Sequence, residues 1–260
     1  MKNRFFSRYE WEDIGSDGVN AYALYDEMVM MTTDRMHIFA ENIDQAAKDF
    51  GIKVDEMVFL SRHSSASGKP ALTVHAIGNY KDNQMGGVYG TLVKSTPHTM
   101  TATLRSIKEL NDNSEYGVSF EVTHHGPYVD VPTMYMEIGS DESRWTDTHA
   151  ADILVNAFLR RNNENYVVAV GIGGGHYAPR FSDMALTHRI DFGHMIPAYQ
   201  LKGSTDDEIT EMINSAMRKS NADVIYLHHN SMSESEERRI ENLVDSLGFE
   251  RVSSKDVDRI

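Results

Sequence analysis

Short apolar runs alternate with longer segments of helical periodicity, and this alternation is the feature that most constrains the fold. Runs typical of strands occupy residues 57–61, 71–77, 117–122, 133–138, 166–171 and 224–227. The last two are apolar almost throughout, as parallel strands buried on both faces are. Segments 99–110, 147–161, 205–220 and 233–247 carry apolar residues at helical spacing. The pattern predicts an α/β fold, with a mixed, largely parallel sheet and helices on both of its faces.

Capping residues set the limits of these helices. Thr146 or Asp147 is placed to cap the segment 147–161, and Ser204 or Thr205 precedes an acidic first turn. Gly248 is placed to end the last helix. The first 50 residues or so lack a clear pattern, so their strands cannot be ordered from sequence. We expect a single domain, an α/β hydrolase, over residues 1–260.

The sequence contains no cysteine, which excludes disulfides and thiolate zinc sites. Any metal must therefore be held by His, Asp or Glu. No apolar run approaches the ~20 residues needed to cross a bilayer, and the first residues show no signal-peptide core. These features predict a cytoplasmic, soluble protein with no membrane partner.

The net charge of −14 excludes a general attraction to nucleic acid, but the charge is uneven. Residues 201–260 carry 13 acidic against eight basic residues, whereas residues 57–108 carry one acid, Asp82, against six basic residues. Either this is a local basic patch for a polyanion, or it is chance clustering on a solvated face. The six basic residues are Arg62, Lys69, Lys81, Lys94, Arg105 and Lys108.

The placement of the 12 histidines is the main functional signal. A single histidine at a strand end is more often structural, but here four predicted strands are each followed by one or two. Ligands bind outside the carboxyl ends of strands in open α/β sheets, so these imidazoles are expected near an active site. His228 and His229 are interpreted as structural because a capping turn follows them, and His37 and His149 as structural from their context. The remaining strand-end histidines are His63, His124, His125 and His176.

Glutamates accompany these histidines. Glu121 lies three residues before His124, and on an extended strand the two side chains would point to opposite faces unless the chain bends. Glu137 lies inside the run 133–138, where a carboxylate is unfavourable unless it is paired. Histidine with glutamate is typical of hydrolytic zinc sites, although a His-Glu-x-x-His helix motif is absent and a metal-free mechanism stays open. Candidate metal ligands are Glu121, His124, His125, His176, His188 and His194, and candidate catalytic residues are His63, His125, Glu137 and His176.

A glycine run follows the predicted strand 166–171. Backbone N–H groups of Gly173, Gly174 and Gly175 are placed to approach a phosphate or an oxyanion. We expect Pro179 to prevent the helix that a dinucleotide-binding fingerprint requires, and neither a Walker loop nor a serine-hydrolase elbow is present. The segment 193–199 and His188 are expected to form the opposite wall of the same cleft.

Four ordered motifs resemble the archaeal and plant type of D-aminoacyl-tRNA deacylase. They are SRHSSASGKPALTVHAIGN at 61–79, EVTHHGP at 121–127, GIGGGHYAPRF at 171–181 and GHMIPAY at 193–199. The resemblance extends from about residue 55 to 230 and is weaker over the first 50 residues. It implies a monomer of the phosphorylase/peptidyl-tRNA-hydrolase fold that depends on zinc. The implied reaction hydrolyses D-aminoacyl-tRNA to a free D-amino acid and tRNA, with broad tolerance of the amino-acid side chain.

The resemblance implies a pool of motif residues rather than an assigned ligand set. The pool consists of His63, His75, Glu121, His124, His125, Glu137, His176, His188 and His194. Substrate or tRNA contacts are expected from Arg62, Ser64, Ser65, Lys69, His75, Asn79, Gly173, Gly174, Gly175 and Arg180. The basic segment 57–108 would hold the phosphates of the acceptor stem.

Two other functions remain compatible with the residues. One is a metal-dependent hydrolase of small amides or esters, for which the basic segment would be incidental. The other is a non-catalytic RNA-binding module that uses the glycine run for phosphates.

Overall fold

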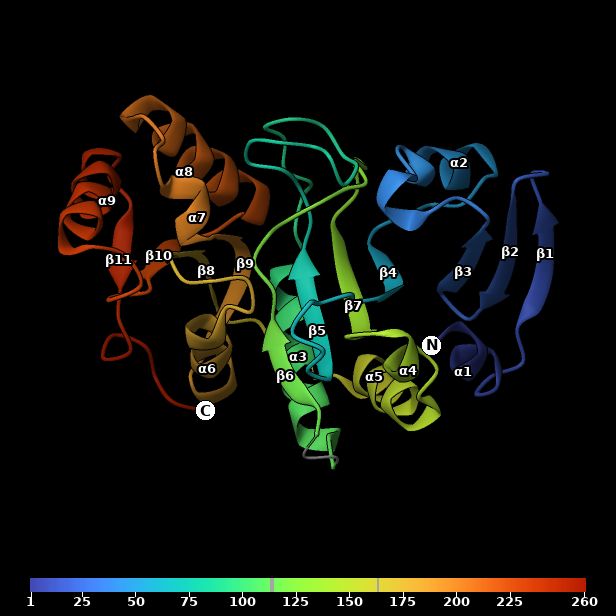
Figure 1. Ribbon diagram of the computed structural model, residues 1–260. Helices are drawn as coiled ribbons and strands as arrows, with labels where there is room; N and C mark the ends of the chain where they lie inside the picture. Colours follow the sequence, from blue (N-terminus) through green and yellow to red (C-terminus); the bar gives the residue numbers. More distant parts are fainter. Residues whose placement is uncertain (113–114, 163) are drawn as a thin grey trace.

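The computed structural model describes residues 1–112, 115–162 and 164–260, and their strands form three sheets (Figure 1). The first sheet is an antiparallel meander of β1 (Glu12–Ser16), β2 (Asn20–Tyr25) and β3 (Met28–Thr33). It lies at the right of Figure 1 and contains the N-terminal strands that could not be ordered from sequence.

The second sheet is mixed and has the order β4-β7-β5-β6. Its strands are β4 (Met57–Arg62), β7 (Thr133–Gly139), β5 (Ala71–Ala76) and β6 (Gly117–Phe120). β7 pairs parallel with β4 and antiparallel with β5, and β5 pairs parallel with β6. All four correspond to predicted strands.

The third sheet is wholly parallel and has the order β11-β10-β8-β9. Its strands are β11 (Glu250–Val252), β10 (Val224–Leu227), β8 (Val167–Ile172) and β9 (Ile190–Ile196). β8 and β10 were predicted, whereas β9 and β11 were missed. The mixed α/β class is therefore confirmed, and the strands are divided among several sheets.

The helices include the four that periodicity predicts. α8 and α9 each begin with a capping box, at Thr205 and Ser233, and Asp147 caps α5 with its carboxylate. No helix of the described residues is long and apolar enough to span a membrane. The helical segments are α1 (Lys2–Phe6), η1 (His37–Phe39), α2 (Ile43–Asp49), α3 (Pro97–Leu110), α4 (Glu142–Trp145), α5 (Thr148–Arg160), α6 (Pro179–Thr187), α7 (Ala198–Leu201), α8 (Asp206–Ser220) and α9 (Glu234–Ser246).

The expectation that Pro179 prevents a helix is wrong, because α6 begins at this proline. The first helical position tolerates proline, since the N–H that proline lacks would have no partner within the helix. α6 nevertheless starts several residues after the glycine run, so the run still does not form a dinucleotide fingerprint.

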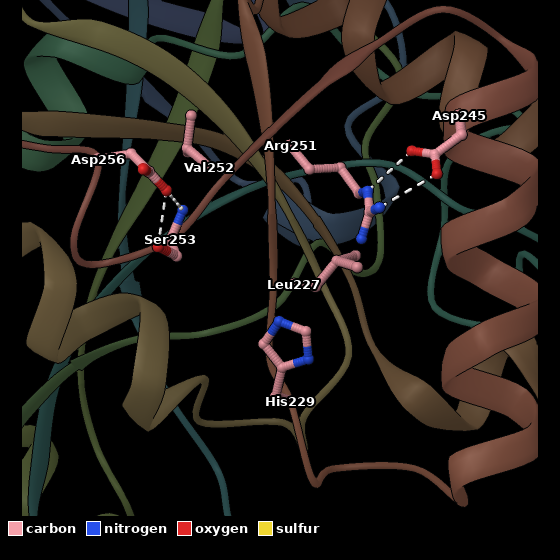
Figure 2. Close-up of a pocket in the computed structure, with 7 residues that line it drawn as sticks. All are labelled: Leu227, His229, Asp245, Arg251, Val252, Ser253 and Asp256. Carbon is pink, nitrogen blue, oxygen red and sulfur yellow. Dashed lines mark hydrogen bonds and ion pairs between the residues drawn. The ribbon is translucent and has the colours of Figure 1, made fainter.

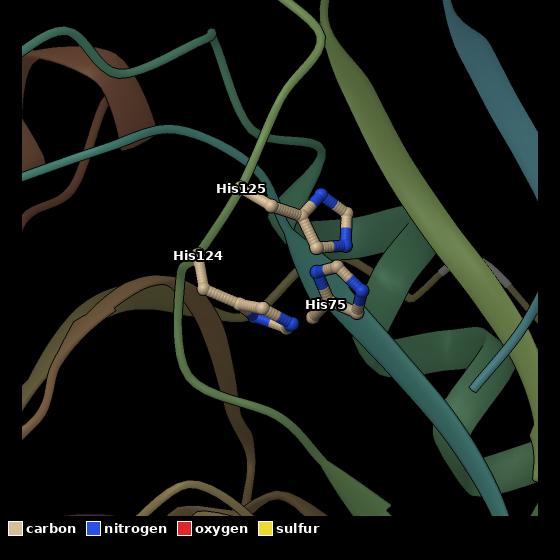
Figure 3. Close-up of side chains that lie close together, drawn as sticks. All are labelled: His75, His124 and His125. Carbon is tan, nitrogen blue, oxygen red and sulfur yellow. The ribbon is translucent and has the colours of Figure 1, made fainter. Parts of the chain in front are cut away.

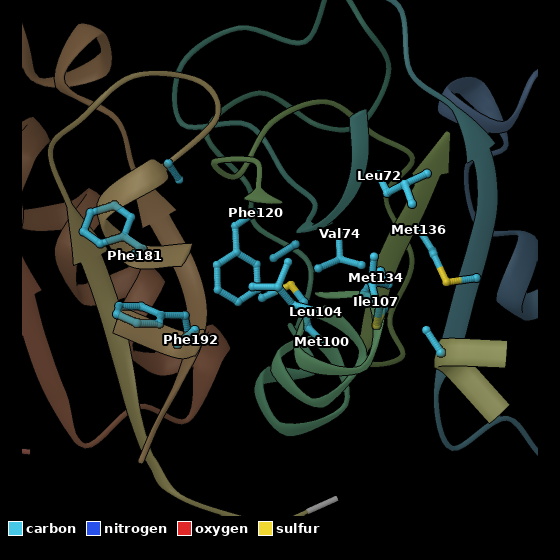
Figure 4. Packing of buried hydrophobic residues seen from close by; sticks show 14 of the residues in the cluster. Leu72, Val74, Met100, Leu104, Ile107, Phe120, Met134, Met136, Phe181 and Phe192 are labelled. Atoms are coloured by element: carbon cyan, nitrogen blue, oxygen red, sulfur yellow. The ribbon is translucent and has the colours of Figure 1, made fainter. Parts of the chain in front are cut away.

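A shared core joins the mixed and parallel sheets (Figure 4). The ring of Phe120 in β6 lies 6.1 Å from that of Phe192 in β9, and the Phe192 ring is 5.4 Å from Phe181 in α6. Past these rings, the backbone N–H of Thr123 donates to the carbonyl of Met195 at 3.3 Å. The segment that follows β6 therefore runs beside the parallel sheet.

Candidate active site

The chain bends where β6 ends, and this bend builds the site. Val122 donates its N–H to the carbonyl of His176 at 2.9 Å, and His125 adopts a left-handed conformation with φ of 46°. Glu121 and His124 face the same side, with Oε2 of Glu121 3.5 Å from Nε2 of His124. The alternation expected for an extended strand does not apply here.

Two buried carboxylates form the centre of the site. Glu121 and Glu137 are 1% and 3% exposed. His63 approaches both, with Nδ1 3.1 Å from Oε1 of Glu121 and 3.3 Å from Oε2 of Glu137. Nε2 of His176 lies 2.9 Å from Oε2 of Glu121, and Nε2 of His75 lies 3.9 Å from Oε2 of Glu137. Three of the four motifs thus meet around one pair of acids.

Glu121 is close to these imidazoles without hydrogen bonding to them. Neither of its carboxylate oxygens has a hydrogen-bond partner among the described residues, and neither does Nε2 of His75. Buried polar atoms are normally satisfied, so these three call for an explanation. An ion bound between these side chains would explain this arrangement, because the ligands of an ion face a shared point instead of one another.

His75, His124 and His125 lie together, and each ring is anchored by a backbone carbonyl (Figure 3). Their ring centroids are 4.4 to 5.0 Å apart. Nδ1 of each ring lies 3.1, 2.7 and 2.6 Å from the carbonyl oxygens of Ala76, Val122 and Gly126, respectively. Because a carbonyl only accepts, Nδ1 carries the proton, and the Nε2 atom of each neutral ring is left with a lone pair.

The electrostatics keep part of this cluster neutral. Burial lowers the pKa of His125 to about 4, helped by the neighbouring His75. Burial and the same neighbour lower the pKa of His124 well below its ordinary value. Two unprotonated imidazoles are therefore present at neutral pH. The pKa of His75 is raised despite its burial because Glu137 faces it, so a bound metal would displace a proton there.

His63 is the charged imidazole of the site. Burial opposes its protonation, but Glu137 and Glu121 outweigh burial and raise its pKa to about 9. The carboxylates respond in the opposite direction. Burial favours their protonated forms, yet the surrounding histidines lower the pKa of Glu121 and, more strongly, that of Glu137. The site thus holds two carboxylates with a cation between them.

The donor set fits a metal ion. Three groups of ligand atoms lie within 4.8 Å of one another: His75 with His124 and His125, His63 with Glu121 and His176, and His75 with Glu121 and Glu137. Imidazole nitrogens and carboxylate oxygens are the ligands of cysteine-free zinc sites. The carbonyl partners on Nδ1 correspond to the outer hydrogen bonds that usually orient such imidazoles.

His188 and His194, two candidate ligands, do not join this cluster. His188 lies next to the amino end of β9, at the opposite end from the carboxyl ends where the cluster forms, and bonds to Thr187. His194 lies within β9, with Nδ1 3.0 Å from the hydroxyl of Thr123 and Nε2 2.8 Å from the carbonyl of Val93. Both nitrogens of His194 are therefore used for structure.

The glycine run differs from its expected role as a clamp. The N–H of Gly173 donates to the carbonyl of Ile196 at 2.8 Å, and that of Gly174 to the hydroxyl of Ser231 at 2.9 Å. Among the described hydrogen bonds, the N–H of Gly175 alone in this run has no acceptor, and this residue is exposed. The structure supports a role of the turn in positioning His176 more clearly than a role in binding an anion.

The other candidate contact residues occupy varied positions. Arg62 lies over the Trp145 ring at 4.7 Å, and Arg180 lies 5.9 Å from the Tyr226 ring. Asn79 is buried and donates to the carbonyl of Gly86, so it supports the loop 80–91. Ser64 and Lys69 are exposed on the loop after β4, and the Ser65 hydroxyl is 3.0 Å from that of Ser67.

The basic segment is not one surface. The guanidinium of Arg105 donates to Asp191 and to the backbone carbonyls of Ala185, His188 and Ile190. It therefore stabilises the fold and is not available to RNA. Lys69, Lys94 and Lys108 are exposed, and of these only Lys69 lies on the loop that follows His63.

Three aromatic residues of the site were missed by sequence reasoning. The Tyr177 hydroxyl lies 2.9 Å from Nε2 of His63, and the Trp145 indole donates to the His63 carbonyl at 2.7 Å. Tyr135 stacks on His75, with centroids 5.2 Å apart. Tyr177 follows His176 directly and was within a quoted motif, whereas Trp145 gave no signal. Gly139 completes the site, because a Cβ there would lie 2.8 Å from Cβ of His63.

A separate depression of about 400 Å³ lies where β10 and β11 end (Figure 2). Its cation, Arg251, is already paired with Asp245 and Glu241, and His229 pairs with Glu237. His228 and His229 thus stay outside the cluster, as predicted. His37 contacts Ser61, and His149 contacts Asp112.

Comparison with known proteins agrees with the motifs. A family model described as D-aminoacyl-tRNA deacylase matches residues 50–252. A protein of that name from Picrophilus torridus is 39% identical over 190 residues, which cover 73% of this chain and 72% of that protein. One from Archaeoglobus fulgidus is 33% identical over 261 residues, covering 98% and 90%. One from Methanococcoides burtonii is 38% identical over 222 residues, and the match spans 85% of this chain but only 46% of that protein.

A solved structure has the same fold. It is a crystal structure of a conserved protein of unknown function, with a TM-score of 0.89 and 31% sequence identity. The match covers 100% of this chain and 93% of the other. The likeness therefore includes the N-terminal sheet as well as the two sheets that build the site.

Proposed function

The chain belongs to the D-aminoacyl-tRNA deacylase family, and from this premise we propose that it hydrolyses the ester between a D-amino acid and the 3′-terminal ribose of tRNA. The products are the free D-amino acid and intact tRNA, so the reaction proofreads chirality across many amino acids. The observation that carries the proposal is the buried pair Glu121 and Glu137 enclosed by imidazoles. Ester hydrolysis requires groups that take a proton from water and meet a developing negative charge, and this cluster supplies both.

We propose that a zinc ion is held by the Nε2 atoms of His75, His124 and His125. The support is the carbonyl partner on each Nδ1 and the unpartnered Nε2 of His75. When bound, zinc lowers the pKa of a water molecule and polarises a carbonyl group. Glu121 or Glu137 would add a carboxylate ligand from the adjoining group.

Two histidines on the other side of Glu121, His176 and His63, are assigned to proton transfer and to stabilising charge. His176 is the partly exposed imidazole that contacts this carboxylate, so water reaches it most easily. We assign it the role of general base, with the nearby Glu121 carboxylate stabilising the imidazolium that forms when His176 takes a proton. His63 is a cation at neutral pH and bonds to the Tyr177 hydroxyl, so the two are assigned to stabilise the oxyanion.

We propose that the protein acts as a monomer in the cytoplasm, where charged tRNA is found. Arg62 and Lys69 are exposed on β4 and on the loop that follows it, and we assign them to phosphates near the 3′ end.

The direct test compares D-tyrosyl-tRNA with L-tyrosyl-tRNA at equal concentrations, with zinc supplied. We expect rapid release of D-tyrosine and little release of L-tyrosine. A Glu137→Gln variant serves as the inactive reference, and Glu109→Gln, at an exposed position on α3, as its matched control. Equal rates on the two enantiomers would contradict the proofreading role, and hydrolysis of neither would contradict the activity.

A further inference from the structure

An apolar rim flanks the His/Glu cluster. The described residues expose eight large hydrophobic side chains, and four of them lie on the loop 80–91 or on α7. Such a concentration beside a site usually marks a binding surface. We infer that Tyr199, on α7, stacks against the unpaired terminal adenine of tRNA. The inference rests on the proposed function and names the part of the substrate that this rim recognises. The four residues are Met85, Val88, Tyr89 and Tyr199.

α7 is fixed beside the turn that carries His176. The N–H of Ala198 donates to the carbonyl of Gly174 at 3.0 Å. The next residue, Tyr199, is 51% exposed. Tyr199 is therefore an exposed aromatic residue beside the turn that carries His176.

The loop 80–91 forms the other side of the rim. It contacts the segment that carries the histidines, since Gly126 donates its N–H to the Met85 carbonyl at 3.1 Å. The approach is close, because a Cβ on Gly126 would lie 2.2 Å from the nitrogen of Gly87. The loop is thus held directly beside His125. Two of its side chains, Met85 and Tyr89, are 56% and 68% exposed.

The chemistry of the substrate identifies the occupant. The scissile ester is on the terminal ribose, so the base on that ribose must lie within one nucleotide of the cluster. That base is unpaired and offers a flat face, which aromatic side chains bind by stacking. The chain carries a net charge of −14, so general attraction to the RNA backbone is weak, and stacking supplies affinity that is independent of charge.

The experiment is a double-mutant cycle on RNA binding. An uncharged acceptor-stem hairpin ending in adenosine is compared with the same hairpin lacking the terminal base, using wild type and Tyr199→Ala. Each single change should weaken binding roughly tenfold, and the two together should weaken it no further. Tyr199→Phe should retain binding because it keeps the aromatic face. A terminal 2-aminopurine should be quenched by wild type and by Tyr199→Phe but not by Tyr199→Ala.

The outcomes separate this inference from the proposed function. The stacking role would be overturned if the two changes weakened RNA binding independently, or if Tyr199→Ala quenched 2-aminopurine as strongly as wild type does. Either result would hold even if wild type hydrolyses D-aminoacyl-tRNA. A concentration-dependent dimer of wild type that Tyr199→Ala dissociates, with RNA binding unchanged, would make the rim a contact between copies instead. Val19→Ala is the control for loss of exposed apolar surface. Val19 is 55% exposed and lies between β1 and β2 of the N-terminal sheet.

Discussion

Nε2 of His176 lies 2.9 Å from Oε2 of Glu121, although His176 follows a strand of the parallel sheet and Glu121 follows a strand of the mixed sheet. The contact exists because the two sheets share a core at Phe120 and Phe192. The candidate site is therefore a property of the packed pair of sheets, and the following predictions depend on that arrangement.

Glu121→Gln should reduce kcat/KM for D-aminoacyl-tRNA by about 10²–10⁴-fold, because the neutral amide cannot stabilise the imidazolium that forms when His176 takes a proton. The side chain keeps its volume, so circular dichroism should remain that of wild type. Exposed Glu109→Gln is the matched control and should keep full activity. A variant at Glu121 with wild-type kcat/KM would contradict the central role of this carboxylate.

His124→Ala should bind zinc at least tenfold more weakly than wild type, since it removes one of three converging imidazoles. Metal content after dialysis, measured with activity before and after chelation, checks this. His229→Ala is the control, because His229 belongs to an exposed histidine–glutamate group elsewhere. Equal zinc in both variants would exclude the proposed imidazole group as the metal site.

Arg105→Met should lower the free energy of unfolding by about 3–5 kcal/mol, because it leaves the fully buried Asp191 without its guanidinium partner. Denaturant unfolding measures the loss. Lys108→Met, at an exposed position on the same helix, should change stability by less than about 0.5 kcal/mol. Similar effects of the two substitutions would show that the contacts of Arg105 do not stabilise the fold.

Acidification should destabilise the protein partly through His194. Its Nε2–H donates to the Val93 carbonyl and its Nδ1 accepts from Thr123, so the folded state holds the neutral ring. Burial lowers its pKa to about 4 from an ordinary value of 6.5. Between these values the unfolded chain binds a proton that the folded chain does not, so stability is present above pH 6.5 and is lost as pH falls towards 4.

The difference between the folded and unfolded pKa of His194 corresponds to a loss of about 3 kcal/mol in the free energy of unfolding at the acid end of this window. Denaturant titrations of wild type and His194→Gln at about pH 7 and about pH 4 measure it. The variant should be less stable at pH 7 but should lose less stability on acidification. An equal pH dependence in both proteins would show that His194 does not titrate with this shift.

Lys69→Glu should raise KM for D-aminoacyl-tRNA and make the salt slope of RNA binding shallower by about one unit or more, since each phosphate contact contributes about 0.9. Binding of uncharged tRNA at several salt concentrations measures the slope. Lys255→Glu, an equal charge change within the acidic C-terminal region, should leave the slope unchanged. Equal slopes for the two variants would remove Lys69 from the RNA-binding surface.

Local patterns in the sequence were enough for much of the fold. The strands β4, β5, β6, β7, β8 and β10 and the helices α3, α5, α8 and α9 were predicted because each carries its own periodicity or capping residues. β9 was missed because Asp191, Gly193 and His194 interrupt its apolar run. Each is explained by a contact elsewhere. Asp191 pairs with Arg105, a Cβ on Gly193 would lie 2.3 Å from Oγ of Ser220, and the N–H of His194 donates to Ser220.

The sequence by itself determined the α/β class and supplied the histidines and glutamates, because strand-forming patterns and residue types are local properties. Tertiary structure decided which of them meet. It turned the chain after β6 so that Glu121 faces His124, and it brought His176 to Glu121 across two sheets. It also left His188 and His194 out, and it used Arg105 within the core. These outcomes depend on backbone bends and on packing between distant segments, and neither is encoded in the spacing of residues along the chain.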